Sequence, residues 1–252
     1  MIRVAVAGAA GRMGETVCAA VEGAEDMELV GRADPLLGTT LEQVLTGTGP
    51  PNSPDSPGRP PEVVVDFTRP DTALGNALAC VRAGVHVVVG TTGFDPAPLR
   101  QAPGGRASHR DRPKANVLIA PNFAIGAVLM MRFAAEAARH MAKAEIVELH
   151  HDQKLDAPSG TAARTAELMA AAGGGERAGG IPIHSVRLPG LVAHQVVIFG
   201  DVGQTLTIRH DTIGRESFMP GVLLAIRRVG SLEDSPVVGL EHLLFTAATE
   251  AG

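Results

Sequence analysis

Residues 2–14, IRVAVAGAAGRMG, decide the fold of the first part of the chain. An apolar run rich in β-branched residues leads into three glycines, and a helical pattern follows from 12 to 21. Glycines at this point let the backbone turn tightly and approach a pyrophosphate closely. Gly8, Gly11 and Gly14 are spaced G-x-x-G-x-x-G, a variant of the dinucleotide-binding fingerprint. The stretch predicts a strand, a dinucleotide-binding turn and a helix; the alternative is a purely structural turn.

Apolar runs of the same kind recur along the first half of the chain. The further strands expected there are residues 27–33, 63–67, 86–90 and 117–120. Helical patterns fall between most of them, notably at 71–83. Near-continuous apolar strands that alternate with helices indicate a parallel sheet covered on both faces, joined by right-handed crossovers. We therefore predict an α/β, Rossmann-like, doubly wound parallel sheet.

The pattern changes after Asn122. A long helix is expected at 125–141, a strand at 144–149 and a helix at 162–172. Three strand-like runs without intervening helices then follow, at 181–188, 194–199 and 204–210. Consecutive strands of this kind predict a second, α+β domain built on a mixed or antiparallel sheet. A helical run at 221–228 and a short tail at 237–245 follow.

Composition excludes several classes of partner. The chain has 252 residues, a net charge of −5, no Trp, no Tyr and seven Phe. Nucleic acid and anionic membranes are therefore not expected as partners. No signal peptide or membrane-spanning run is evident, so we expect a cytoplasmic protein. Residues 46–61, with six prolines and three glycines, and the polar stretch 104–114 are interpreted as surface loops.

Further cofactor candidates follow the later strands. Asp34 ends the second strand, where an acid can accept hydrogen bonds from ribose hydroxyls, although an Asp before a proline is also an ordinary turn residue. The GTTG segment 90–93 and the APNF segment 120–123 end two other strands, on the side where open α/β sheets bind ligands. Threonine caps of a helix and an interdomain hinge are their respective alternatives.

Residues 148–162, ELHHDQKLDAPSGTA, carry the candidate chemistry. His150, His151 and Lys154 lie within five residues at the end of an apolar alternating run. Directly after them, the Ser-Gly-Thr triplet 159–161 precedes a helix, and amides at a helix start favour an anion. Imidazoles, an ammonium group and an anion-binding helix start together predict a pocket for a small carboxylate that receives a proton.

The two histidines allow two other interpretations. Neighbours on a strand point to opposite faces, so one histidine would be in the core and one at the surface unless the strand ends there. Histidines also bind zinc, but no carboxylate or cysteine stands at a convincing spacing to complete a site. We therefore predict catalysis and no metal.

The quoted motifs resemble one family. GAAGRMG, VVVDFT, GTTGF, APNFA and above all ELHHDQKLDAPSGTA resemble the 4-hydroxy-tetrahydrodipicolinate reductase (dihydrodipicolinate reductase) family of lysine and diaminopimelate biosynthesis. GIPIHSVRLPGLVAHQVVIFG and QTLTIRHD are similar to its second domain, so the resemblance covers nearly the whole chain. Three features depart from the family pattern: Ala124 where many members have serine, a short segment 173–180, and the proline-rich loop 46–61.

The resemblance implies an enzyme that reduces a cyclic imine dicarboxylate with NADH and/or NADPH. It implies a dinucleotide-binding domain, 1–121, completed by 221–252, around a substrate-binding and oligomerisation domain, 122–220, in a homotetramer. His150 takes the position of the proton donor and Lys154 that of its partner. The implied substrate-binding residues are His151, Ser159, Gly160 and Thr161. The implied cofactor-binding residues are Gly8, Gly11, Arg12, Met13, Gly14, Asp34, Gly90, Thr92, Ala120, Asn122 and Phe123.

Two rival functions remain open at this point. Another NAD(P)-dependent dehydrogenase of a small carboxylate would keep GAAGRMG but has no need of HHDQKLDAPSGT. A non-catalytic nucleotide-sensing protein should lose the proton donor, yet His150 and Lys154 are present. On cofactor choice, Asp34 argues for NADH, while Arg12 and Arg32 lie near enough in sequence to favour a 2′-phosphate. We expect both cofactors to work, with NADH equal or modestly better.

Overall fold

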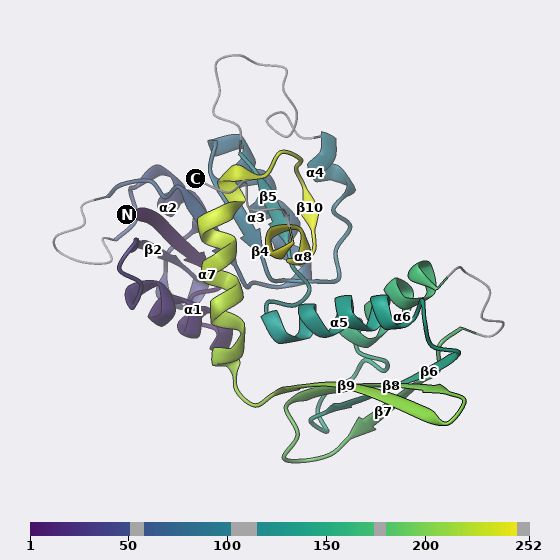
Figure 1. The fold of residues 1–252 in the computed structure, drawn as a ribbon. Helices are drawn as coiled ribbons and strands as arrows, with labels where there is room; N and C mark the ends of the chain where they lie inside the picture. Colours follow the sequence, from purple (N-terminus) through teal and green to yellow (C-terminus); the bar gives the residue numbers. More distant parts are fainter. Residues whose placement is uncertain (51–57, 102–114, 174–179, 246–252) are drawn as a thin grey trace. The chain divides into compact units, whose positions relative to one another are not determined.

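The computed structural model describes residues 1–50, 58–101, 115–173 and 180–245. The chain divides into two compact units, one formed by Met1–Phe123 with Met219–Gly252 and the other by Ala124–Phe218 (Figure 1). The expected polar loop 104–114 lies wholly outside the described residues, as do the middle of the loop 46–61 and most of the segment 173–180. Within the described ranges, no helix has the length and apolar character needed to cross a membrane.

The first unit is built on a six-stranded sheet in the order β10-β5-β4-β3-β1-β2, in which every pairing is parallel. Its strands are β1 (Ile2–Ala7), β2 (Met27–Ala33), β3 (Val63–Asp66), β4 (His86–Val89), β5 (Val117–Ile119) and β10 (Val237–Val238). Its helices are α1 (Arg12–Glu22), α2 (Leu41–Thr46), α3 (Pro70–Ala83), α4 (Ala97–Gln101), α7 (Met219–Arg228) and α8 (Glu241–Leu244). The predicted doubly wound parallel sheet is confirmed.

Apolar side chains from helices cover this sheet on both faces. Ala5, Val64 and Val87 belong to a buried cluster with side chains of α2, α3 and α4. Residues of the alternate register, such as Val4 and Val65, are fully buried as well, and α1 and α7 contact each other (Figure 1). A sheet buried on both sides explains why its strands are apolar without alternation.

The register of the sheet aligns the carboxyl ends of its strands. Ala7 pairs with Ala33 on one side and with Asp66 on the other. Asp66 pairs with Val89, which pairs with Ile119. The segments that follow β1 to β5 therefore all leave the sheet at one edge, the edge where open α/β sheets bind ligands.

The second unit contains a four-stranded mixed sheet in the order β7-β6-β8-β9. Its strands are β6 (Lys143–His150), β7 (Ile183–Arg187), β8 (Ala193–Asp201) and β9 (Gln204–Thr212). The β6–β7 pairing is parallel and the other two are antiparallel, which confirms the predicted mixed sheet. Helices α5 (Ile125–Ala137) and α6 (Gly160–Ala172) pack on each other over one face (Figure 1).

Some predicted bounds differ from the structure. Helix α5 ends at Ala137 rather than at 141, because β6 begins at Lys143 and the chain needs the intervening residues to turn. Helix α6 begins two residues early, at Gly160. Strand β10 was not predicted, since a two-residue strand has no periodicity that a sequence can reveal.

Gly14 provides a test of the glycine loop. A Cβ at position 14 would overlap the carbonyl oxygen of Gly8, whereas a Cβ at Gly75, exposed within α3, would meet nothing within 4 Å. We expect Gly14→Ala to lower the free energy of unfolding and to abolish NADH binding. The control Gly75→Ala should stabilise by about 0.5–1 kcal/mol. Urea unfolding and NADH fluorescence titration measure both, and unchanged NADH binding in Gly14→Ala would refute the tight loop.

Candidate active site

The glycine loop joins β1 to α1 through contacts that only small residues allow. Gly8 has φ of 77°, and a Cβ there would lie 2.6 Å from the carbonyl oxygen of Phe67. The amide of Gly11 donates to the carbonyl of Gly8 at 3.0 Å, and Gly11 is the N-cap of α1. The first turn of α1 therefore begins at the carboxyl edge of the sheet, and no side chain caps its amides, which fits a pyrophosphate.

The side chain of Asp34 contacts both its own turn and the glycine loop. Its Oδ1 accepts from the amide of Leu36 at 2.9 Å, which caps a short 3-10 turn. Its Oδ2 accepts from the amide of Ala10 at 3.1 Å. The turn role is thus present, and the same carboxylate also lies against the loop that would hold the dinucleotide.

The two arginines near this loop have different surroundings. Arg12 is exposed and is the first residue of α1. Arg32 instead donates from Nη2 to Glu22 at 2.7 Å, in the last turn of α1. The glycine loop precedes the first turn of that helix, so the guanidinium of Arg32 is directed away from it.

Two aromatic rings lie beyond the carboxyl ends of β3 and β5. The rings of Phe67 and Phe123 have centroids 5.7 Å apart. A Cβ at Gly90, which follows β4, would overlap the ring of Phe67, so glycine is required there. In the GTTG segment the hydroxyl of Thr91 is buried and donates to the carbonyl of Thr68 at 3.2 Å, whereas Thr92 is exposed.

These segments bring the predicted cofactor residues to one edge of the sheet. They are Gly8, Gly11, Arg12, Met13 and Gly14 after β1, Asp34 after β2, Gly90 and Thr92 after β4, and Ala120, Asn122 and Phe123 after β5. Sequence reasoning did not single out Phe67, although its position at the end of the VVVDF run was visible. The arrangement fits a dinucleotide, because glycine backbone, an acid and apolar rings follow neighbouring parallel strands.

In the second unit, His150 is the last residue of β6. Its imidazole is 14% exposed and its Nδ1 contacts a carboxylate oxygen of Glu148, two residues earlier on the same face. His151 lies beyond the strand and is exposed. The strand thus ends between the two histidines, and the two imidazoles have different surroundings.

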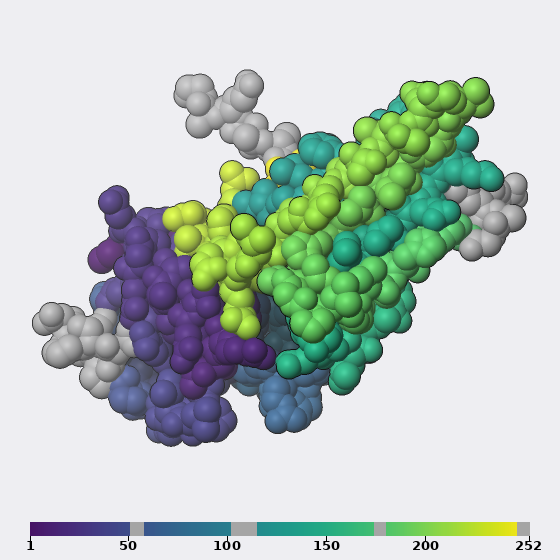
Figure 2. Space-filling view, turned by 90° about the horizontal axis from the view of Figure 1, so that it is seen from below, coloured from purple at the N-terminus to yellow at the C-terminus, as the bar shows by residue number. Residues whose placement is uncertain are grey.

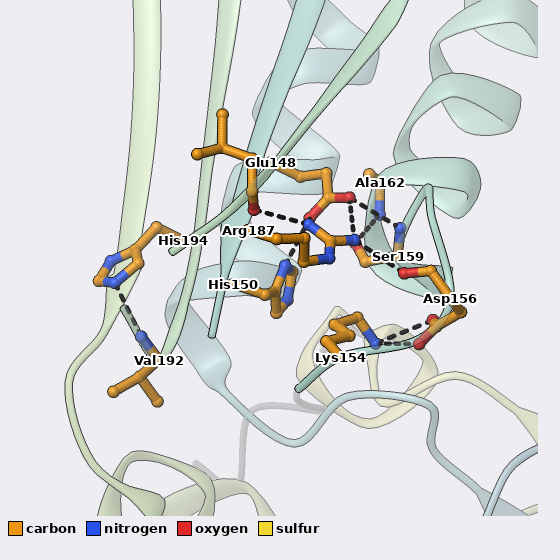
Figure 3. Close-up of polar contacts among 10 residues, drawn as sticks. Glu148, His150, Lys154, Asp156, Ser159, Ala162, Arg187, Val192 and His194 are labelled. Carbon is orange, nitrogen blue, oxygen red and sulfur yellow. Dashed lines mark hydrogen bonds and ion pairs between the residues drawn. The ribbon is translucent and has the colours of Figure 1, made fainter. Parts of the chain in front are cut away.

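The carboxylate of Glu148 is completely buried and is bound by several donors (Figure 3). Arg187, on β7, donates to both oxygens, at 2.9 Å from Nη1 and 2.7 Å from Nη2. The amide of Ser159 donates to Oε1 at 3.3 Å, and His150 contacts Oε2. A carboxylate has about four lone-pair positions, so these contacts satisfy a buried charge that would otherwise be costly.

Burial and hydrogen bonding set the pKa values of Glu148 and His150. Burial raises the pKa of Glu148, but hydrogen bonds from Arg187, Ser185 and His150 outweigh it and hold this pKa below its usual value. Burial lowers the pKa of His150, and the charges of Lys154 and Arg187 act in the same direction against the carboxylate. The ligand-free protein therefore favours an ionised Glu148 and a neutral His150 at neutral pH.

Lys154 is held by the loop that follows β6. Its Nζ donates to both carboxylate oxygens of Asp156, at 2.7 and 2.8 Å. The hydrogen bond from Lys154 lowers the pKa of Asp156. Arg187 Nη2 in turn donates to the carbonyl of Asp156 at 2.7 Å, so the arginine that binds Glu148 also holds this loop (Figure 3).

The remaining predicted residues form the start of α6. Ser159 is 3% exposed and is the N-cap, since its Oγ accepts from the amide of Ala162 at 3.2 Å. Gly160 and Thr161 are the first helical residues, and a Cβ at Gly160 would meet nothing within 4 Å. The helix start is therefore open beside Gly160, while the amide and hydroxyl of Ser159 are engaged within the protein.

Sequence reasoning missed Glu148 and Arg187 as functional residues. The signal for Glu148 was an acid on the strand face of Ala144 and Ile146, where alternation predicts burial. Arg187 gave no signal of its own, because its pairing depends on the register between β6 and β7, in which it lies opposite His150. Within the described ranges, no three His, Cys, Asp or Glu side chains come together as metal ligands.

Comparisons with known proteins cover both units. Residues 2–123 match a family model described as dihydrodipicolinate reductase, N-terminus, and residues 126–244 match its counterpart for the C-terminus. The chain is 50% identical to the 4-hydroxy-tetrahydrodipicolinate reductase of Nocardia farcinica, over 96% of this chain and 98% of the relative. It is 48% identical to that of Thermobifida fusca, over 97% and 99%.

A solved structure is similar along the same length. It is a dipicolinate-bound dihydrodipicolinate reductase from Paenisporosarcina sp. TG-14, with a TM-score of 0.78 and 39% identity. The similarity covers 96% of this chain and 99% of that one.

The buried ion pair between Glu148 and Arg187 leads to a prediction about stability. Glu148→Ala leaves the guanidinium of Arg187 without its partner, so we expect the free energy of unfolding to fall by about 3–5 kcal/mol. Glu167→Ala is the matched control, because Glu167 forms an exposed pair with Arg164 at 3.2 Å and exposed pairs contribute about 0–1 kcal/mol. Urea unfolding followed by circular dichroism measures both variants. Equal losses in the two would contradict the importance of the buried pair.

Proposed function

The chain belongs to the dihydrodipicolinate reductase family, and from this premise we propose how its residues divide the work of the reaction. Its activity is the reduction of 4-hydroxy-tetrahydrodipicolinate, an oxidoreductase step of lysine and diaminopimelate biosynthesis. The observation that carries this function is the identity of about half of all positions over nearly the whole length of curated relatives. It disfavours both rivals, the unrelated dehydrogenase and the nucleotide sensor. A nicotinamide cofactor follows from the family.

The reaction needs a hydride and a proton at neighbouring ring atoms. Loss of water from the hydroxylated substrate gives a cyclic, conjugated imine with two carboxylates. A bound nicotinamide supplies the hydride to C4. The electron pair then moves through the conjugated system, and a proton must be added at the carbon next to C4 to give tetrahydrodipicolinate. A positioned acid typically contributes 10²–10⁴-fold to such a step.

We assign the proton to His150. An imidazole titrates near neutral pH, and this one lies at the end of β6 beside the open start of α6. Its pKa is lowered by burial and by neighbouring cations in the free protein. A dianionic substrate placed beside it favours the charged form, so substrate binding itself protonates the donor that the reaction uses.

The substrate carboxylates are assigned to the residues around this imidazole. Amides at the start of α6, at Gly160 and Thr161, point out of the helix and favour an anion. Lys154 has three N–H donors, of which Asp156 takes two, and the third is directed to a carboxylate in the proposal. His151 is exposed next to them. Ser159 contributes by fixing the helix start. Dipicolinate, a flat dicarboxylate bound by the similar structure, should occupy the same positions.

We propose that both NADH and NADPH bind at the carboxyl edge of the first sheet. Asp34 favours NADH, because a carboxylate accepts from ribose hydroxyls and repels a 2′-phosphate. Arg12, exposed at the start of α1, provides a partner for that phosphate. Since Arg32 is paired with Glu22, this compensation rests on Arg12.

The proposed homotetramer would form through the second-unit sheet. Helices α5 and α6 cover the face that includes Ile146 and Val197, and no described helix of this unit covers the other face (Figure 1). Pairing and alternation place on that open face Val147, Leu149, Val186, Val196 and Ile198. Figure 2 looks onto this side, where β8 and β9 form a light-green ridge. The same face also carries ion pairs, of Glu145 with His184 and of Asp211 with His194 and Arg209. A sheet face that combines apolar side chains with charged pairs fits a second copy of the chain.

The activity and the donor are tested together. The purified protein should oxidise NADH when the cyclic condensation product of aspartate semialdehyde and pyruvate is supplied. His150→Gln should lower kcat by about 10²-fold or more with little change in NADH binding. His140→Gln, on an imidazole 71% exposed in the turn after α5, is the control and should leave turnover unchanged. Near-normal turnover in His150→Gln would remove it as donor.

The cofactor assignment is tested at Asp34. Asp34→Asn removes the charge and keeps one side-chain oxygen, which can accept from one of the two backbone amides, of Ala10 or Leu36, that the two carboxylate oxygens now bind. The ratio of kcat/KM for NADPH over NADH should rise by about tenfold, or 1.4 kcal/mol. Because Asp34→Ala also loses the contact with the glycine loop, it should weaken both cofactors. An unchanged ratio in Asp34→Asn would place the ribose elsewhere.

The oligomer is tested by native mass spectrometry. We expect a tetramer for the wild-type chain and smaller species for Val196→Asp, which introduces a further charge among the apolar side chains of the open face. A Val196→Asp chain that stays tetrameric would show that this face is not the interface.

A further inference from the structure

The contacts of Glu148 and its partner Arg187 connect three of the groups that the proposed function places around the substrate. The carboxylate contacts the imidazole of His150 and accepts from the amide of Ser159, which caps α6. Its partner Arg187 also donates to the carbonyl of Asp156, whose carboxylate holds Lys154. One buried ion pair therefore connects the proposed proton donor, the anion-binding helix start and the lysine.

We propose that Glu148, held by Arg187, is a positioning residue that fixes His150 in the tautomer with hydrogen on Nδ1, so that Nε2 exchanges the proton with the substrate. The inference rests on the proposed role of His150 as donor. Glu148 itself touches neither substrate nor cofactor in this account.

The protonation state of the carboxylate sets the tautomer. Arg187 donates to both of its oxygens, which is the geometry of an ionised carboxylate, and the lowered pKa of Glu148 agrees. An ionised carboxylate only accepts hydrogen bonds. The ring atom that contacts it, Nδ1 of His150, must therefore carry a hydrogen in both the neutral and the charged imidazole.

The proton then has one route. In the charged imidazole both nitrogens carry hydrogen. The Nδ1 hydrogen stays on the ring and is donated to the carboxylate of Glu148. The Nε2–H bond breaks while the new C–H bond forms on the substrate anion, so the imidazole becomes neutral and the ring carbon gains the proton. At 14% exposure the imidazole can regain a proton from water between turnovers.

The carboxylate that orients the imidazole is itself held in place. Glu148 and His150 are two residues apart on one strand and share a face. The carboxylate has no exposed surface, and Arg187 on β7 and the Ser159 amide hold it from other sides. The charged groups near the imidazole are thus Glu148 on its own strand, Arg187 on the neighbouring strand and Lys154 on the loop.

The test combines a tautomer measurement with kinetics. In protein carrying ¹⁵N-labelled histidine, NMR should show the Nδ1–H tautomer for neutral His150, assigned by comparison with His150→Gln. Glu148→Gln should change the tautomer population, lower kcat by roughly 10²-fold or more and shift the pH dependence of kcat, while NADH binding stays unchanged. Arg187→Lys, which keeps a cation but not the two-point contact, should retain the tautomer and lose less activity. Glu167→Gln, on an exposed pair of the same unit, should behave as wild type.

The outcomes that overturn the positioning role of Glu148 differ from those that overturn the donor role of His150. A neutral His150 in the Nε2–H tautomer of the wild-type protein overturns the inference, even if Glu148→Gln fails to fold. So does a folded Glu148→Gln with wild-type kcat and pH profile while His150→Gln is inactive, and in that case the donor assignment survives. If His150→Gln itself keeps full turnover, the proposed function of the imidazole fails first.

Discussion

A buried carboxylate at Glu148 is the constraint on which the site depends. An ionised group without solvent costs several kcal/mol unless donors surround it, and the fold supplies them from β6, β7 and the start of α6. Each donor that satisfies the charge is also fixed by it. The same interaction thus stabilises the second unit and determines where the imidazole of His150, the first turn of α6 and the loop with Lys154 lie.

The first unit depends on a different constraint, the alignment of parallel strands. Parallel pairing places the carboxyl ends of the strands at one edge, and the register from Ala33 to Ile119 keeps those ends level. Neighbouring atoms then lie too close for any side chain at three positions. A Cβ at Gly8 or Gly14 would overlap backbone atoms, and a Cβ at Gly90 would overlap the ring of Phe67. Asp34 links the second strand to the loop through the amide of Ala10. The edge suits a dinucleotide because its backbone is accessible.

Local patterns predicted the sheet of the first unit, the mixed sheet of the second and the end of β6 at the histidines. These depend on hydrophobic periodicity and turn residues, which a sequence displays directly. The pairing of Glu148 with Arg187 could not be predicted, because the two are 39 residues apart and meet only through the β6–β7 register. The hydrogen bond from Arg32 to Glu22 likewise depends on how β2 and α1 pack together, which the sequence does not display. The roles assigned to the site residues and the domain functions remain predictions.

The most direct measurement is a crystal structure of the chain with NADH and a flat pyridine-2,6-dicarboxylate. We expect Nε2 of His150 to face the ring, one carboxylate to lie at the amides of Gly160 and Thr161, and the other to contact Lys154. Glu148 should keep its contacts with Arg187 and with Nδ1 of His150. A dicarboxylate bound away from β6 and the start of α6, or an imidazole that presents Nδ1 to it, would contradict the account.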